Sequence, residues 1–308
     1  MNCLLLGAAG FIGTNLAIRL SKEDNMNLIL VDQKKEYFLN IEKKQLSNAT
    51  IKVLTFSNEM DFDGLVDNID IVYHLVSTSI PANSNQHIPL ELESNVIFTS
   101  YLLEACVRKK VSKVVFVSSG GTVYGKETEC PLKEETPTFP ITSYGIQKIT
   151  IEKLLYLYKN MYNLDYRIIR LSNPYGPYQR PDGILGAVTT FTYKAMTGEP
   201  IIIYGDGSVI RDFVYIEDAI NAMIKITCEE AKYKTYNVGS GVGVSIRQLV
   251  EIIQKTLNVN TDIQFSSGRA VDVPVNYLDI SRYEDEFGKL ALTSLEEGIA
   301  KTFRFLKD

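Results

Sequence analysis

Apolar runs of strand length alternate with amphipathic segments of helix length over residues 1–171. Such an alternation predicts strands that are joined by helices. Because the strand-length runs are almost uniformly apolar, they should be buried on both faces, as in a parallel sheet covered by helices. We therefore predict an α/β fold with a Rossmann-type, doubly wound parallel sheet. The runs are CLLLG, NLILVD, IKVL, DIVYHL, KVVFVSS and YRIIRL, and the main helical segments are 14–22, 92–108 and 144–161.

The character of the chain changes after Leu171. The stretch SNPYGPYQRPDG is rich in proline, glycine and polar turn formers, and the later strand-like runs are shorter and separated by loops. We expect residues 172–308 to form mainly a smaller, irregular C-terminal substrate lobe. Residues 1–171 should form the sheet domain, which also takes a later segment near 212–238, because helix-like segments continue into the second half.

Composition narrows the class of protein. With 308 residues, 45% of them hydrophobic, the chain can bury a full core. The formal charge of −5 gives no general attraction for nucleic acid, so an anionic ligand would be held by a few placed arginines. His74 and His87 are the only histidines, and none of the four cysteines belongs to a CxxC pair, so we expect no metal site. No apolar stretch approaches the ~20 residues of a membrane span, and we expect a cytoplasmic protein.

Three glycines mark a candidate phosphate-binding loop. Gly7, Gly10 and Gly13 form GAAGFIG directly after the first predicted strand and at the start of a predicted helix. This context lets the backbone approach a pyrophosphate at the helix N-terminus. Asp32 closes the second strand where a carboxylate accepts hydrogen bonds from an adenosine ribose and repels a 2′-phosphate. The pattern favours NAD over NADP, although the two lysines after Asp32 offset part of the repulsion.

Tyr144 and Lys148 are candidates for catalysis. They lie four residues apart in SYGIQK, so on a helix they share a face. A nearby ammonium lowers the pKa of a tyrosine from its usual value of about 10, and an oxidised nicotinamide adds charge of the same sign. The phenolate can then take a proton from a sugar hydroxyl while hydride leaves the carbon. YxxxK also occurs on ordinary amphipathic helices, but here it follows a strand that ends in SSGGTVYG.

The motifs together resemble the extended short-chain dehydrogenase/reductase family, and within it the nucleotide-sugar 4-epimerases, reductases and 4,6-dehydratases. The resemblance covers essentially the whole chain and is much more specific for the superfamily than for a substrate. It rests on GAAGFIG, Asp32, HLVS after Tyr73, Asn95 in SNVIFTS, SSGGTVYG, YGIQK, NPYGP, GDGSVIRDFVYIEDA and RAVDVP.

The resemblance implies a role for each matching position. Tyr144 is the catalytic base and acid, and Lys148 tunes it and holds the nicotinamide ribose. Asn276 gates the room at the sugar C2 substituent, which implies tolerance of N-acetylated sugars. The other implied contacts are Gly7, Gly10, Phe11, Ile12, Gly13, Asp32, Leu75 and Ser118 with NAD, Asn173, Arg211 and Arg269 with the diphosphate of a nucleotide sugar, and Asp272 with the nucleotide ribose.

The sequence departs from the family pattern at two places. Relatives carry a Ser or Thr four residues before the tyrosine of VYG, where this chain has Gly120. Ser119 or Thr122 must then supply the hydroxyl that orients the sugar O4; we choose Thr122, and we expect Gly120→Ser to be tolerated or activating. The segment VLTFSNEMD also lacks the Gly-Asp pair that holds adenine in relatives, and Asn58 is the stand-in.

These residues lead us to expect an NAD-dependent UDP-sugar 4-epimerase of surface-polysaccharide synthesis. The alternative is a dTDP-4-keto-6-deoxyhexose 4-reductase, which uses the same tyrosine, lysine and cofactor but donates its hydride once. A 4,6-dehydratase needs an Asp-Glu pair where this chain has Gly121 and Thr122. A non-catalytic NAD-binding protein would be expected to have lost the Tyr144 and Lys148 pair.

We also expect a homodimer. The helical segments 92–108 and 144–161 carry more apolar residues than one sheet face needs, and in the family such helices pair as a four-helix bundle across a two-fold axis. The residues that suggest this are Leu102, Leu103, Leu154, Leu155 and Leu157.

Overall fold

The computed structural model describes residues 1–81, 84–126, 129–181, 186–268 and 273–308, and the chain divides into two compact units. Each unit is assembled from three segments of the sequence. The first contains Met1–Ser118, Thr142–Ile169 and Tyr233–Thr235, and the second contains Ser119–Ile141, Arg170–Lys232 and Tyr236–Asp308.

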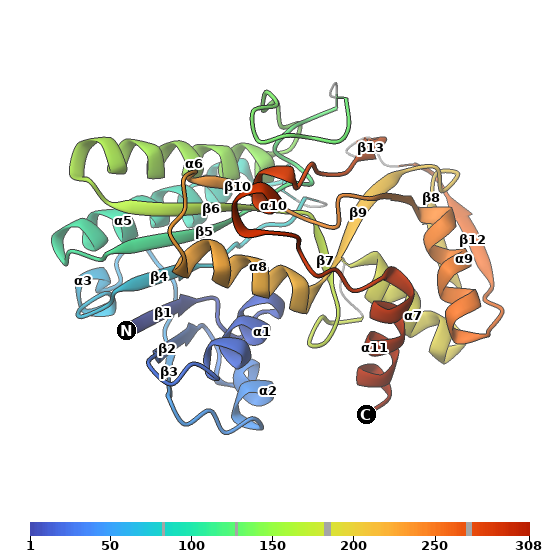
Figure 1. The fold of residues 1–308 in the computed structure, drawn as a ribbon, viewed down its shortest axis with the longest axis horizontal. Helices are drawn as coiled ribbons and strands as arrows, with labels where there is room; N and C mark the ends of the chain where they lie inside the picture. The colour runs from blue at the N-terminus through green and yellow to red at the C-terminus, as the bar shows by residue number, and fades with distance from the viewer. Residues whose placement is uncertain (82–83, 127–128, 182–185, 269–272) are drawn as a thin grey trace. The chain divides into compact units, whose positions relative to one another are not determined.

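The first unit is built on a seven-stranded sheet in the order β10-β6-β5-β4-β1-β2-β3 (Figure 1). All six apolar runs form strands of this sheet, as predicted. The strands are β1 (Asn2–Leu6), β2 (Asn27–Asp32), β3 (Ala49–Val53), β4 (Ile71–His74), β5 (Lys113–Ser119), β6 (Asp165–Leu171) and β10 (Thr235–Val238). The helices are α1 (Phe11–Leu20), η1 (Lys35–Phe38), α2 (Leu39–Glu42), α3 (Phe62–Leu65), α4 (Ile88–Leu92), η2 (Glu93–Ile97), α5 (Phe98–Arg108) and α6 (Ser143–Tyr162).

The parallel pairing of β1 with its neighbours brings the carboxyl ends of these strands to one edge of the sheet. β1 pairs in parallel with β2 on one side and with β4 on the other, and Leu6 stands opposite His74. The carboxyl ends of β1 and β4 therefore meet at the same edge. The loops that follow these strands leave the sheet side by side, which is where doubly wound folds bind ligands.

The predicted helix over residues 92–108 differs from the structure in one respect. Between α4 and α5 the backbone forms η2, one π-helical turn that contains Asn95. A π turn inserts an extra residue into a helix and changes the direction of the side chains around it. The pattern of apolar residues does not reveal such a turn, because the α-helical period resumes on each side.

The core of the first unit lies between the sheet and the helices α3, α5 and α6. Leu4 and Leu6 of β1, Phe116 of β5 and Phe98 of α5 belong to one buried cluster. His74 is buried beside the Phe98 and Phe116 rings, and burial lowers its pKa to about 3, so it is neutral. The sheet is thus covered by apolar side chains, as the uniformly apolar strands predicted.

The second unit is less regular and holds two small sheets. One has the order β11-β9-β13 with β7 also paired to β9, and the other joins β12 to β8. Its strands are β7 (Asn173–Tyr175), β8 (Ile201–Tyr204), β9 (Ile210–Tyr215), β11 (Gly243–Ser245), β12 (Ile263–Ser266) and β13 (Val275–Asn276). Its helices are α7 (Ala187–Thr197), α8 (Ile216–Cys228), α9 (Ile246–Leu257), α10 (Ser281–Phe287) and α11 (Leu295–Lys307).

The boundaries of the two units can be set beside the expected domains of residues 1–171 and 172–308. The second segment of the first unit ends at Ile169, two residues before the expected boundary at 171, and Ser119–Ile141 belongs to the second unit. Of the later segment near 212–238, only Tyr233–Thr235 joins the first unit. Within the described ranges, no helix combines the length and apolar character that a membrane span requires.

Candidate active site

The glycine loop joins β1 to α1 in a turn that side chains would obstruct. Gly7 has φ +84°, and a Cβ there would lie 3.2 Å from the carbonyl carbon of Leu75 and from the Val76 nitrogen. A Cβ at Gly13 would overlap the Gly7 carbonyl oxygen. Gly10 is the N-cap residue of helix α1 and has no side chain to cap it, so the first N–H groups of the helix stay available to an anion.

Asp32 holds the glycine loop from the end of β2. One carboxylate oxygen accepts the Ala9 N–H at 3.0 Å, and the other accepts the Gln33 N–H at 2.8 Å. The residue is 9% exposed, and the two hydrogen bonds hold its carboxylate beside the glycine loop. A carboxylate oriented in this way can accept hydrogen bonds from ribose hydroxyls as well.

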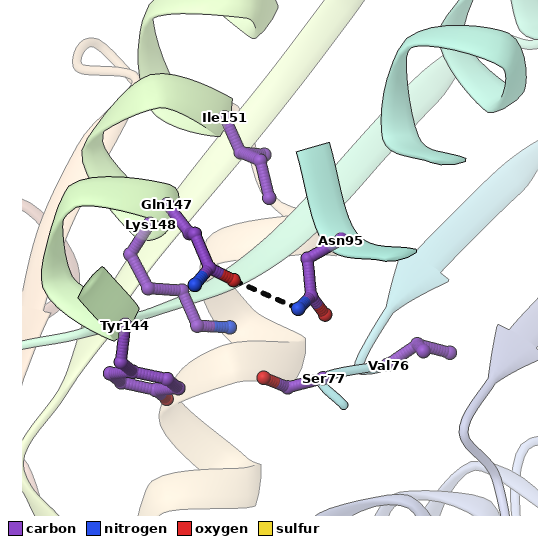
Figure 2. A pocket seen from close by; sticks show the side chains of 7 residues that line it. All are labelled: Val76, Ser77, Asn95, Tyr144, Gln147, Lys148 and Ile151. Carbon is purple, nitrogen blue, oxygen red and sulfur yellow. Dashed lines mark hydrogen bonds between the residues drawn. The ribbon is translucent and has the colours of Figure 1, made fainter. Parts of the chain in front are cut away.

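Tyr144 and Lys148 share a face of α6 and line one pocket, as their spacing predicted (Figure 2). Thr142 caps the helix by accepting the Gly145 N–H at 3.2 Å. The Lys148 Nζ donates to the Val117 carbonyl oxygen at 2.9 Å and lies 5.3 Å from the centroid of the Tyr144 ring. The other side chains of the pocket are Val76, Ser77, Asn95, Gln147 and Ile151.

The glycine loop and this pocket are connected through the loop after β4. Leu75 and Val76 pack against Gly7, and Val76 and the next residue, Ser77, line the pocket beside Tyr144. The fold therefore brings the predicted dinucleotide loop and the predicted catalytic pair to one edge of one sheet. Among the predicted cofactor residues, Leu75 has its place at this junction.

Burial dominates the charge state of the two catalytic candidates. It raises the pKa of Tyr144 to about 12, and it lowers the pKa of Lys148 to about 8, against the opposing effect of the nearby Glu152 carboxylate. The predicted lowering of the tyrosine pKa by the lysine is therefore not found in the protein alone. The ammonium is aimed at a carbonyl oxygen and the ring face, and its attraction for a phenolate does not outweigh desolvation.

The Ser118 side chain, which was predicted to contact the cofactor, forms a hydrogen bond within the protein. Its hydroxyl donates to the Glu152 Oε1 at 2.6 Å, and both side chains are buried. Glu152 lies one turn after Lys148 on α6, so this bond joins the end of β5 to the catalytic helix. The Ser118 side chain is thus engaged within the protein.

Two neighbouring positions in the second unit bear on the missing hydroxyl. Gly120 is enclosed, since a Cβ there would lie 2.6 Å from the Leu278 Cδ1 and 3.1 Å from the Arg170 carbonyl oxygen. The Thr122 Oγ1 is buried and has no hydrogen-bond partner among the described residues. A buried hydroxyl without a partner is costly unless a ligand satisfies it.

The remaining substrate candidates also lie in the second unit. Asn276 is 1% exposed; its Nδ2 donates to the Gly120 carbonyl oxygen at 3.1 Å, and its Oδ1 finds no partner in the described part of the chain. The Asn173 Nδ2 donates to the Asp212 carbonyl oxygen at 2.9 Å. The Arg211 guanidinium is held by two carbonyl oxygens, those of Ile210 and Val273. Arg269 and Asp272 lie outside the described residues.

The chain offers the groups that NAD requires. The start of α1 leaves backbone N–H groups that a pyrophosphate could contact, and the Asp32 carboxylate could accept hydrogen bonds from a ribose. The Asn58 Oδ1 is buried with no partner among the described residues, so an adenine amine could donate to it. Phe11, Ile12 and Gly13 form the first turn of α1.

Sequence reasoning missed Gln147. This residue lies between Tyr144 and Lys148 and is 2% exposed. Its Oε1 accepts from the Asn95 Nδ2, as Figure 2 shows, and its Nε2 donates to the Glu91 Oε2. The only signal in the sequence was the letter Q in YGIQK. Asn95 and Glu91 are more than fifty residues away in the sequence, so no local pattern could identify them as partners.

A parallel sheet with a glycine loop after β1, a carboxylate after β2 and a Tyr-Lys pair on a covering helix defines a Rossmann-type, dinucleotide-dependent enzyme. Residues 3–239 match the model of the NAD-dependent epimerase/dehydratase family, and the chain belongs to that family. The predicted fold class and family are thereby confirmed.

Three relatives illustrate the range of this family. The chain is 32% identical to a UDP-glucose 4-epimerase of Mycolicibacterium smegmatis, over all of this chain and 99% of the relative. It is 30% identical to an Escherichia coli dTDP-4-dehydro-6-deoxyglucose reductase, over 99% and 97% of the two chains. The UDP-glucuronic acid 4-epimerase of Bacillus cereus, solved with UDP-glucuronic acid and NAD, superposes with a TM-score of 0.90 at 26% identity, over 100% and 99%.

Proposed function

We propose that the protein is an NAD-dependent 4-epimerase of a UDP-linked hexose. The observation that carries the proposal is the pocket in which Tyr144 and Lys148 lie beside the loop that packs against the dinucleotide-binding glycines. The similarity over full length to UDP-sugar 4-epimerases supports the choice of substrate class.

Tyr144 accepts the proton of the sugar C4 hydroxyl at its phenolic oxygen and later returns it. NAD, when bound, supplies the hydride acceptor for C4 and a positive charge. Because burial alone holds the pKa of Tyr144 at about 12, the phenolate needs added positive charge to form near neutral pH. Lys148, held by the Val117 carbonyl oxygen, keeps its ammonium over the tyrosine ring.

Residues of the second unit hold the rest of the substrate in this proposal. Thr122 donates to or accepts from the C4 oxygen, since its buried hydroxyl has no partner in the described residues; Ser119 is the alternative donor. Asn173 and Arg211 contact the diphosphate, for which a planar guanidinium is well suited. Asn276 lies at the C2 substituent, and its Oδ1, which has no partner among the described residues, suits an N–H or O–H of the sugar.

A dTDP-4-keto-6-deoxyhexose 4-reductase is the second candidate, because the similarity to the E. coli reductase is almost as high and covers almost the same length. The two reactions share every group in the pocket. They differ in whether the hydride returns to the same sugar.

One experiment separates the candidates. Purified protein is denatured to identify any released dinucleotide, and native protein is then given UDP-glucose, or the dTDP-4-keto sugar with NADH. We expect interconversion of UDP-glucose and UDP-galactose, a tightly held NAD and no net change in absorbance at 340 nm. Stoichiometric consumption of NADH with the keto sugar, and no isomerisation of UDP-hexoses, would establish the reductase instead.

We further propose that the protein is a cytoplasmic homodimer. The predicted interface residues are mostly covered within the chain: Leu102, Leu103 and Leu155 are buried in the core, and only Leu157 of that group is exposed. Other apolar side chains of η2, α5 and α6 do reach the surface, namely Ile97, Tyr101, Ile146, Tyr156 and Met161. Sedimentation at micromolar concentration should show a dimer; a monomer alone would contradict the proposal.

A further inference from the structure

Gln147 has every hydrogen-bonding position of its side chain occupied. Its Nε2 donates to the Glu91 Oε2 at 3.0 Å and to the Ser143 Oγ at 2.9 Å. Its Oε1 accepts from the Asn95 Nδ2 at 2.8 Å and from the Ser79 Oγ at 3.3 Å. An amide that is 2% exposed and fully satisfied holds its surroundings in one arrangement.

The surrounding groups determine which way this amide faces. The Thr78 backbone N–H donates to the Asn95 Oδ1 at 2.9 Å, which turns the Asn95 Nδ2 toward Gln147. The Gln147 oxygen must therefore face Asn95. Its nitrogen must face Glu91, because a carboxylate accepts hydrogen bonds and has none to donate. Neither a carboxylate nor an apolar side chain at position 147 could satisfy both neighbours.

The amide joins four parts of the first unit. Gln147 lies on α6, Glu91 on α4, Asn95 on the π turn η2, and Ser79 in the loop after β4 whose earlier residues line the pocket. On α6, Gln147 directly precedes Lys148 and lies three residues after Tyr144, so the bonds restrain the helix turn that carries both (Figure 2).

We propose that Gln147 is a positioning residue: its amide, clamped between Asn95 and Glu91, fixes the rotation of the first turns of α6 and so aims Tyr144 and Lys148 into the pocket. Displacing a reacting group by about 1 Å costs on the order of 100-fold in rate. Loss of the amide should thus reduce kcat strongly while the affinity for nucleotide sugar changes little.

The test uses three variants of the full-length protein. Gln147→Met keeps the length of the side chain and removes all four bonds. Gln147→Glu keeps the acceptor toward Asn95 but places a second carboxylate against Glu91. The double variant Gln147→Glu with Glu91→Gln exchanges the two groups, so that an amide again donates to a carboxylate. Gln254→Met is the matched control, because the Gln254 Nε2 on α9 donates a hydrogen bond to the Thr261 Oγ1 at 2.9 Å and the residue lies outside the pocket.

We expect kcat with UDP-glucose to fall about 100-fold in Gln147→Met and Gln147→Glu, with KM within about threefold of wild type. The double variant should recover at least about tenfold over Gln147→Glu, and Gln254→Met should match wild type. Wild-type kcat in Gln147→Met, or a double variant no better than Gln147→Glu, would overturn the proposal. If Gln147→Met does not fold, Gln147→Glu and the double variant decide alone.

The kinetic part rests on the proposed function, so hydrogen exchange supplies an independent measurement. Amides in the first two turns of α6 should exchange faster in Gln147→Met and Gln147→Glu, and at the wild-type rate in the double variant and in Gln254→Met. Unchanged exchange in Gln147→Met would also overturn the proposal. If wild type turns over no UDP-hexose, the proposed function fails while the exchange pattern still decides the role of Gln147.

Discussion

Gly120→Ser should destabilise the protein, contrary to what the family pattern suggested. A Cβ at Gly120 would lie 2.6 and 3.0 Å from the two methyl carbons of Leu278 and 3.1 Å from the Arg170 carbonyl oxygen. The methyl groups belong to a fully buried side chain, and the carbonyl oxygen is part of the backbone, so neither can move away freely. Overpacking of this kind costs about 1–3 kcal/mol. For a chain of 308 residues this corresponds to a fall in Tm of about 1.5–5 °C.

The neighbouring glycine provides the control. A Cβ at Gly121 would meet only the Ser119 Oγ, at an ordinary 3.8 Å, so Gly121→Ser should unfold near the wild-type temperature. Shortening the obstructing side chain should make room, and in the double variant Gly120→Ser with Leu278→Ala the two losses should be less than additive by about 1–3 kcal/mol. Thermal unfolding followed by circular dichroism measures wild type, Gly120→Ser, Gly121→Ser, Leu278→Ala and the double variant. Equal Tm values for Gly120→Ser, Gly121→Ser and wild type would show that the enclosure of Gly120 has no energetic weight.

Three further predictions concern the cofactor, the hydroxyl and the lysine. Asp32→Ser should weaken NAD binding and relax discrimination against NADP, measured by calorimetric titration; a wild type that prefers NADP would refute the ribose assignment. Thr122→Ala should lower kcat at least tenfold with little change in Tm, because loss of a hydrogen bond that strengthens as charge develops raises the barrier by about 2–4 kcal/mol. Wild-type turnover with Ser119→Ala inactive would move the role to Ser119. Burial lowers the pKa of Lys148 from 10.5 to about 8, so the folded protein loses the Lys148 proton at a lower pH than the unfolded chain does. The free energy of unfolding of wild type relative to Lys148→Met should therefore rise as the pH increases between those two values. A constant difference between the two proteins in urea unfolding over this pH range would contradict the shift.

Much of the fold could be predicted because its determinants are local. The apolar runs predicted the strands of the sheet, and the four-residue spacing of Tyr144 and Lys148 placed both in one pocket. The glycine loop and Asp32 were also found where their order in the sequence indicated.

What the sequence did not reveal depends on contacts between distant residues. Gln147 meets partners that lie more than fifty residues away, and the space at Gly120 is closed by Leu278 from the far end of the chain. The pKa of Tyr144 depends on the balance between desolvation and one ammonium, and that balance follows only from the packed structure. Neither spacing nor residue type encodes these quantities.

The segmented make-up of the first unit limits how the chain can be divided. Its third segment, Tyr233–Thr235, comes from late in the sequence, where the Lys234 carbonyl oxygen accepts the Ile168 N–H at 2.7 Å and the β10 strand covers the side of β6. A polypeptide that stopped after β6 would keep the glycine loop, Tyr144 and Lys148, yet β6 would become a bare edge of mostly buried, apolar residues. Such edges pair with other chains and aggregate. The dinucleotide-binding half should therefore fail as an independently expressed fragment, even though it contains its own catalytic pair.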